Sequence, residues 1–154
     1  MAKKHSISQD RPDIVRHCHE CGKATTRGIQ PMTLHYKGLS ATFDMPGWYC
    51  ACGEGVVSGK DMEVSDRHLN LLKAQAENLV LPTDVRRIRK KLGLNQQAAG
   101  SLLGGGPNAF HKYERGEVLP SKAISNLLRV LEAMPEGLKV LRENGAEKTT
   151  FDRV

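Results

Sequence analysis

The pattern of apolar and polar residues changes character about a third of the way along the chain. After residue 64, apolar residues recur every three or four positions, which is the period of an amphipathic helix. Before that point the apolar residues come in short runs between glycines and polar residues, a pattern typical of small strands. The predicted fold class is therefore α+β with two domains, a small β-rich N-terminal module and an all-α C-terminal domain.

The N-terminal part divides into a tail and a module. Residues 1–16 are polar, so we expect a disordered tail there. Residues 17–62 contain several glycines, all four cysteines of the chain and its one tryptophan, and we expect them to form the β-rich module. The predicted strands of this module are Met32–Tyr36, Ala41–Phe43, Trp48–Cys50 and Gly55–Val57.

Residues 63–82 are predicted to connect the two domains. Ser65 can cap a helix over residues 65–80, in which apolar residues follow at helical spacing up to Leu79. Pro82 is expected to end this helix, because proline lacks the N–H that a helix interior requires.

The C-terminal domain, residues 83–145, is predicted to contain four or five short helices, and residues 146–154 a second tail. Thr83 or Asp84 can cap the first helix, Asn95 the second and Ser121 the fourth. Glycines at 104–106 separate the second helix from the third. The expected helices end at Leu92, at Leu103, at Arg115 and before Pro135, and a short fifth helix is expected over Glu136–Glu143.

The third of these helices, Asn108–Arg115, is too short and too polar to be a core helix. Phe110 and Tyr113 are expected to anchor it, and Glu114 is expected to pair within the domain. A tight connection followed by such a helix is typical of a helix-turn-helix domain, in which this helix enters the major groove of DNA. The residues left to face outward are Asn108, Lys112, His111 and Arg115.

An outward face of Asn and Lys suits base recognition, because Asn can pair with adenine and Lys with guanine. Two plainer interpretations stay open. Asn108 can simply cap the helix, and Lys112 can be a solvated surface charge.

The charge balance agrees with a polyanionic partner. The 154 residues include 23 Lys and Arg against 17 Asp and Glu, which gives a net charge of +6. Nucleic acid is the commonest partner of such a basic chain, although a solvated basic surface explains the charge equally well. The first C-terminal helix offers Arg86, Arg87 and Arg89 as candidate phosphate contacts.

Two cysteine pairs predict a structural metal site. Cys18 and Cys21 form a Cys-x2-Cys pair, Cys50 and Cys52 a tighter Cys-x-Cys pair, and zinc is the default ion for four thiolates. Four protein ligands leave no open position for a substrate, so the Zn²⁺ is expected to stabilise a module whose core is thin. Because the second pair is irregular, His17 or His19 remains an alternative to Cys50, and a redox dithiol remains an alternative to metal binding.

Several classes of protein are excluded at this stage. No run of 18 apolar residues exists to span a membrane, and the N-terminus lacks the apolar region of a secretory signal, so a cytoplasmic protein is expected. No phosphate-binding loop, carboxylate pair or Ser/His/Asp arrangement indicates an enzyme.

The stretch VRRIRKKLGLNQQAAGSLLGGGPNAFHKYERGEVLPS resembles the Xre-type helix-turn-helix. More closely, GGGPNAFHKYERG and LLRVLEAMPE resemble the MqsA antitoxin family, which joins an N-terminal zinc module to such a domain. The resemblance implies that Asn108 reads operator bases and that Gln96 meets a phosphate. Lys112 departs from the family's Arg, and Cys50 is one place away from the family's ligand position, which Tyr49 occupies here.

By the same resemblance, the chain is expected to be an antitoxin that represses its own operon. The helix-turn-helix domain would form a homodimer on a palindromic operator in double-stranded DNA, and the zinc module would bind a toxin that is an mRNA-cleaving ribonuclease. Two alternatives stay open. One is a free-standing Xre regulator whose zinc module senses a metal or another ligand, and the other is a small metal- or redox-handling protein.

Overall fold

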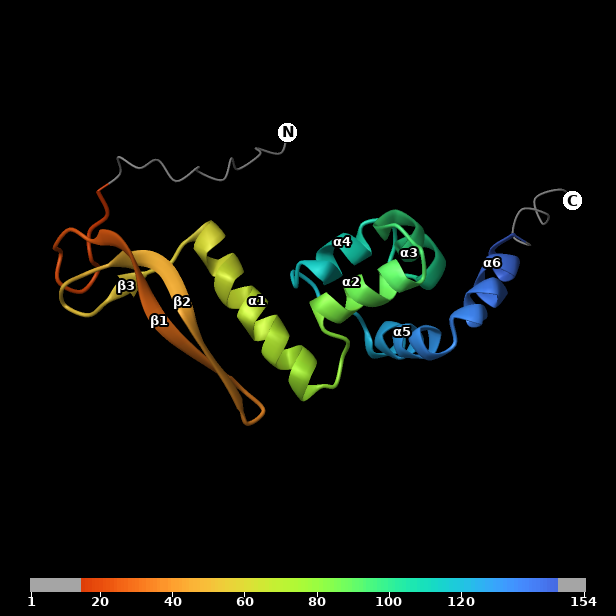
Figure 1. The fold of residues 1–154 in the computed structure, drawn as a ribbon. Coiled ribbons are helices and arrows are strands. Elements are labelled where there is room, and N and C mark those ends of the chain that lie inside the picture. The colour runs from red at the N-terminus through yellow and green to blue at the C-terminus, as the bar shows by residue number, and fades with distance from the viewer. Residues whose placement is uncertain (1–14, 147–154) are drawn as a thin grey trace, which may run out of the picture.

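The computed structural model describes residues 15–146, which form a small antiparallel sheet followed by a series of helices (Figure 1). This arrangement confirms the α+β layout with two domains. The predicted tails lie outside the described residues, apart from residues 15, 16 and 146.

The sheet is a long hairpin with a short third strand. Strands β1 (Thr26–Tyr36) and β2 (Leu39–Tyr49) pair along their whole length, and β3 (Gly55–Val56) pairs with the end of β2. Lys37 and Gly38 close the hairpin with positive φ angles of 46° and 82°, as a two-residue hairpin turn with left-handed residues requires.

The strands predicted at 32–36 and 41–43 were too short, and the one predicted at 48–50 is the end of β2, since the hairpin continues through Pro31 and Pro46. Pro31 lies in an edge strand, and Pro46 in a part of β2 that β3 does not reach. At each proline the strand has only one neighbouring strand, so the missing N–H can face the side that has no hydrogen-bonding partner. The strands therefore continue through both prolines.

Helix α1 (Gly59–Ala76) belongs with the sheet, and Figure 1 shows it between the hairpin and the other helices. The ring of His68 stacks on Phe43 of β2 with 4.0 Å between centroids. The guanidinium of Arg27 in β1 donates two hydrogen bonds, of 2.7 and 2.6 Å, to the buried carboxylate of Asp61. The helix predicted over 65–80 was therefore misplaced, since Ser65 is buried inside α1 and does not cap it.

The remaining helices form the C-terminal domain. They are α2 (Pro82–Lys91), α3 (Gln96–Leu103), α4 (Ala109–Glu114), α5 (Lys122–Ala133), a 3-10 turn η1 (Pro135–Gly137) and α6 (Leu138–Ala146). The side chains of Asn95 and Ser121 accept hydrogen bonds from the N–H groups of Ala98 and Ile124, which confirms both predicted caps. Asn108 makes no side-chain capping bond.

Pro82 begins a helix instead of ending one. Helix α1 ends earlier, at Ala76, and Asn78 follows with a positive φ of 50°. Pro82 is the first residue of α2, where its missing N–H breaks no hydrogen bond. The predicted caps Thr83 and Asp84 therefore lie inside this helix.

One apolar core holds the C-terminal helices together. Its most deeply buried members include Val85 and Ile88 of α2, Phe110 of α4 and Leu128 of α5. The connection after α1 contributes Val80, whose N–H donates to the Oγ of the fully buried Ser125. The short α4 is thus anchored by Phe110 and Tyr113, as predicted from the sequence.

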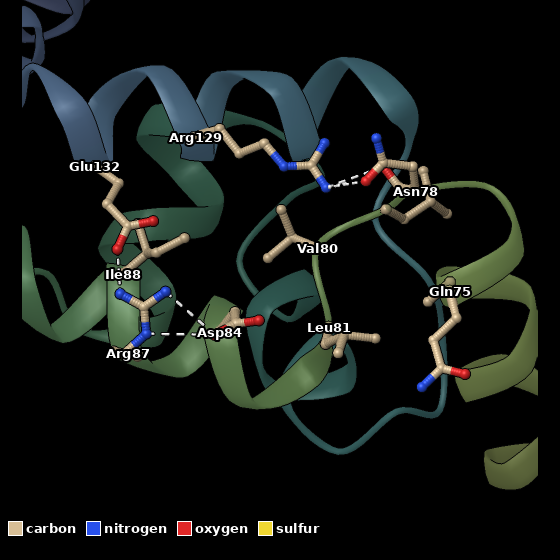
Figure 2. Close-up of a pocket in the computed structure, with 11 residues that line it drawn as sticks. Gln75, Asn78, Val80, Leu81, Asp84, Arg87, Ile88, Arg129 and Glu132 are labelled. Carbon is tan, nitrogen blue, oxygen red and sulfur yellow. Dashed lines mark hydrogen bonds and ion pairs between the residues drawn. The ribbon is translucent and has the colours of Figure 1, made fainter.

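The connection between α1 and α2 is fixed by cations from α5. Arg129 donates to the backbone carbonyl of Asn78 at 3.0 Å and to its side chain at 3.1 Å, and Lys122 donates to the carbonyls of Glu77 and Asn78. These bonds border a cleft of about 290 Å³ between α1, α2 and α5 (Figure 2). Positive charges at the C-terminal end of α1 also suit its helix dipole.

Among residues 15–146, no helix is long and apolar enough to cross a membrane.

Candidate metal centre and nucleic-acid interface

Each cysteine pair lies on a tight turn closed by the backbone. In the first turn the N–H of Gly22 donates to the carbonyl of Cys18 at 2.9 Å, and in the second the N–H of Gly53 donates to the carbonyl of Cys50 at 3.0 Å. Both glycines have positive φ, of 70° and 98°. The first turn precedes β1 and the second joins β2 to β3, so the sheet brings them together.

The four thiols form one compact cluster. The Sγ atoms of Cys18 and Cys52 are 3.6 Å apart, those of Cys21 and Cys50 are 3.4 Å apart, and all four lie within 4.8 Å of one another. A tetrahedral zinc with Zn–S bonds of about 2.3 Å separates its sulfurs by about 3.8 Å. The cluster therefore has the donor atoms and the dimensions of a four-thiolate zinc site.

The crowding of the thiols affects their ionisation. A hydrogen bond from the backbone N–H of Cys52, and then the neighbouring thiol of Cys21, lower the pKa of Cys50 to about 7. The N–H of Glu54 lowers the pKa of Cys52, but the thiols of Cys50 and Cys18 and burial outweigh it, so that this pKa rises to about 12. The raised pKa of Cys52 beside the lowered pKa of Cys50 disfavours two neighbouring thiolates, and a divalent metal ion would supply the compensating charge.

The two histidines offered as alternative ligands lie outside this cluster. His17 directs its Nδ1 to the carbonyl of Gly22 at 3.1 Å, and His19 is exposed. Cys50 joins the cluster although its pair has the tighter Cys-x-Cys spacing. The Cys-x-Cys turn still brings this thiol into the cluster, because Cys50 directly follows β2 and is buried.

A glycine turn places α3 and α4 close together. A Cβ atom on Gly100 of α3 would lie 2.0 Å from the backbone oxygen of Gly106, and one on Gly105 would lie 2.8 Å from the Cβ of Ala109. Glycine is therefore required at both places for the chain to turn from α3 into α4.

The polar face of α4 is open to solvent. Asn108, His111 and Lys112 are exposed, whereas Phe110 and Tyr113 face the core. Asn108 and Lys112 border a surface hollow of about 380 Å³. The residues that line it are Gly105, Gly106, Pro107, Asn108, Ala109, Lys112, Tyr113 and Val118.

Four other predicted DNA contacts have hydrogen-bond or ion-pair partners within the protein. The side chain of Arg89 is only 11% exposed and pairs with Glu114, which limits its access to a phosphate. Gln96 donates to the same carboxylate at 2.9 Å. Arg87 pairs with Asp84 and Glu132 beside the α1–α2 connection (Figure 2), and Arg115, although exposed, pairs with Glu117.

Arg86 stays exposed on α2, and no ion pair involving it is seen within residues 15–146. The sequence alone does not distinguish Arg86 from Arg87 and Arg89, because all three are charged residues of one predicted helix. Which of them is free depends on acidic partners from α4 and α5 that are distant in the sequence. The sequence pattern predicts no role for Val118, and its only signal there is an apolar residue between Gly116 and Pro120.

The sequence also matches a known class of proteins. A family described as the antitoxin component of a bacterial toxin-antitoxin system, MqsA, matches residues 16–142. The chain is 31% identical over 128 residues to Antitoxin MqsA of Escherichia coli (strain K12), an alignment that covers 81% of this chain and 96% of that protein. This chain belongs to the MqsA antitoxin family.

Proposed function

We propose that this protein is a DNA-binding antitoxin of the cytoplasm that represses its own operon and has no enzymatic activity. Membership of the antitoxin family over residues 16–142 is the observation that carries this proposal. A cognate toxin follows from that membership. In our proposal this toxin is an mRNA-cleaving ribonuclease, which the zinc module binds.

The DNA-binding part of the proposal rests on α4. The buried rings of Phe110 and Tyr113 anchor this helix to the core. Asn108 and Lys112 remain exposed on its outer face. An amide and an ammonium group four residues apart can reach base edges in the major groove, with Arg86 of α2 on a phosphate. His111 lies on the same exposed face, and we retain it as a lesser contact.

A homodimer is the form in which such a short helix can read DNA with useful specificity. One six-residue helix reaches only a few base pairs, whereas a two-fold axis doubles the contacts and matches a palindromic operator. We therefore propose that two copies of the C-terminal domain bind adjacent half-sites.

The metal centre has a structural role in this proposal. Zinc held by Cys18, Cys21, Cys50 and Cys52 would join the two turns and so fix the base of the hairpin. When bound, the ion supplies folding free energy to a module that has few buried side chains. Phe43 and Met45 are the buried apolar residues of the sheet, which is a thin core for the whole hairpin.

The proposal is tested with the full chain and the product of the neighbouring gene. Co-expression should yield a copurifying complex in which that product no longer cleaves mRNA, and a reporter driven by the upstream promoter should be repressed by this chain. If no neighbouring product binds while repression persists, the free-standing regulator is the better description. If neither the complex nor the repression is observed, the proposal is overturned. Cys21→Ser should impair formation of the complex more than it impairs repression.

A further inference from the structure

An exposed valine lies beside the polar side chains of α4. Val118, in the loop between α4 and α5, keeps 46% of its surface exposed. It lines the same hollow as Asn108 and Lys112, together with Pro107 and Ala109. The hollow therefore combines apolar groups with one amide and one ammonium group.

The loop that carries Val118 is held from two sides. The N–H of Glu117 donates to the carbonyl of Lys112 at 3.1 Å, which ties the loop to α4. The side-chain amide of Asn70 on α1 donates to the carbonyls of Gly116 and Glu117 at 2.9 and 3.2 Å. A side chain placed by such a fixed loop loses little conformational freedom on binding.

We propose that Val118 is a specificity-determining residue that contacts the 5-methyl group of a thymine in the operator. This inference rests on the proposed DNA-binding function and adds one base contact to it. Thymine carries the one methyl group among the four bases in the major groove, and apolar side chains recognise it. Asn108 suits the edge of an adenine, and Val118 suits the methyl group of a thymine. The residues of one hollow can therefore contact an adenine and a thymine of neighbouring base pairs.

The contact is tested by removing the methyl group from the DNA. An operator is first selected from random-sequence duplexes with the full chain, and each thymine in it is then replaced by deoxyuridine, which pairs identically but lacks the methyl group. We expect one replacement in each half-site to weaken binding about fourfold, the effect of one buried methyl group. The other replacements should change affinity by less than about 1.5-fold, because no buried methyl group is lost there.

The same replacements in Val118→Thr assign the effect to this side chain. Threonine keeps the shape of valine but puts a hydroxyl where one methyl was, so the variant should bind the thymine operator about fourfold more weakly. Its sensitivity to deoxyuridine should be reduced, because threonine retains only one of the two methyl groups. Val15→Thr, at an exposed valine just before the N-terminal module, is the matched control and should behave as the wild type. Circular dichroism should show that both variants are folded.

Three results would overturn the inference. The first is that the wild type is insensitive to deoxyuridine at every position. The second is that Val118→Thr keeps the full sensitivity of the wild type. The third is that Val15→Thr loses as much affinity for the operator as Val118→Thr does. If Asn108→Ala still weakens operator binding in any of these cases, the proposed DNA-binding function survives and this contact alone fails. If no operator can be selected at all, both fail.

Discussion

The carboxylate of Glu114 on α4 pairs with the guanidinium of Arg89 on α2 in the interior of the C-terminal domain. Their side chains are 6% and 11% exposed, and the Nη2 atom of Arg89 is 3.1 Å from Oε2 of Glu114. Arg89 also donates to the carbonyl of Leu94, and Gln96 of α3 donates to Glu114. One carboxylate thus links three helices and holds α4 in place against α2 and α3.

Removing this carboxylate should destabilise the C-terminal domain strongly. Glu114→Ala leaves the guanidinium of Arg89 nearly buried without a counter-charge, which costs about 3–5 kcal/mol of unfolding free energy. Glu117→Ala breaks the exposed pair with Arg115 and should cost less than about 1 kcal/mol. Urea denaturation followed by circular dichroism at 222 nm measures both, and equal losses would contradict the structural role of Glu114.

Acid should weaken the same pair. Burial raises the pKa of Glu114, but hydrogen bonds from Arg89 and Gln96 and the charge of Arg89 outweigh it, so the pKa lies below its ordinary value of 4.5. A carboxyl whose folded pKa is lowered stabilises the protein above its unfolded pKa, and this stability is lost as the pH falls through the folded pKa. We therefore expect stability to decline below about pH 4.5.

Hydrogen exchange of α2 and α5 amides between pH 6 and pH 3 measures this decline for the C-terminal domain by itself. Glu114→Gln removes the ionisable group and should give a flatter pH dependence than the wild type. An equally steep decline in the variant would assign the acid sensitivity to other carboxyls of this domain, such as Glu132, whose pKa a hydrogen bond from Arg87 also lowers.

Gly100→Ala should abolish the α3–α4 turn. Its Cβ would lie 2.0 Å from the Gly106 oxygen, a contact that only a backbone shift can relieve. We expect a loss of operator binding and lower thermal stability, with an unchanged zinc content. Gly145→Ala on α6 meets nothing within 4 Å and should be neutral or slightly stabilising, since alanine favours a helix. Normal DNA binding by Gly100→Ala would show that the turn tolerates displacement.

The cysteine cluster should bind about one zinc per chain, as expected for one four-thiolate site. Cys21→Ser, Cys50→Ser and Cys52→Ser should each lose the metal, while His17→Ala and His19→Ala should retain it. Metal analysis of freshly purified, reduced protein tests this. Removal of the zinc should raise hydrogen exchange in the hairpin more than in α5, and retention of full zinc by Cys50→Ser would require another ligand set.

Asn108 and Lys112 should discriminate between DNA sequences. Each alanine variant should weaken operator binding by about 1–3 kcal/mol and relax the preference at one base pair. Arg86→Ala should instead weaken binding to all sequences alike and reduce its salt dependence. Fluorescence anisotropy on operator and scrambled DNA separates the cases, and an equal loss on both for Asn108→Ala would assign that residue to the phosphate backbone.

Periodicity identified the elements that depend on local chemistry. The caps at Asn95 and Ser121, the glycine break between α3 and α4 and the anchoring of α4 by Phe110 and Tyr113 follow from side chains near their own backbone. Strand lengths did not, because whether Pro31 and Pro46 end a strand depends on which sides of the strand have neighbours.

The sequence by itself determined the two-part layout, the two cysteine pairs as candidate metal ligands and the exposed face of α4. Spacing and helical period act over a few residues, so they can be read directly. Only the tertiary structure decided that α1 packs on the hairpin, that Arg89 is buried with Glu114 while Arg86 is exposed, and that Val118 borders the hollow beside Asn108. Each of these depends on contacts between segments far apart in the chain, and a one-dimensional pattern does not specify which of several similar side chains meets its partner.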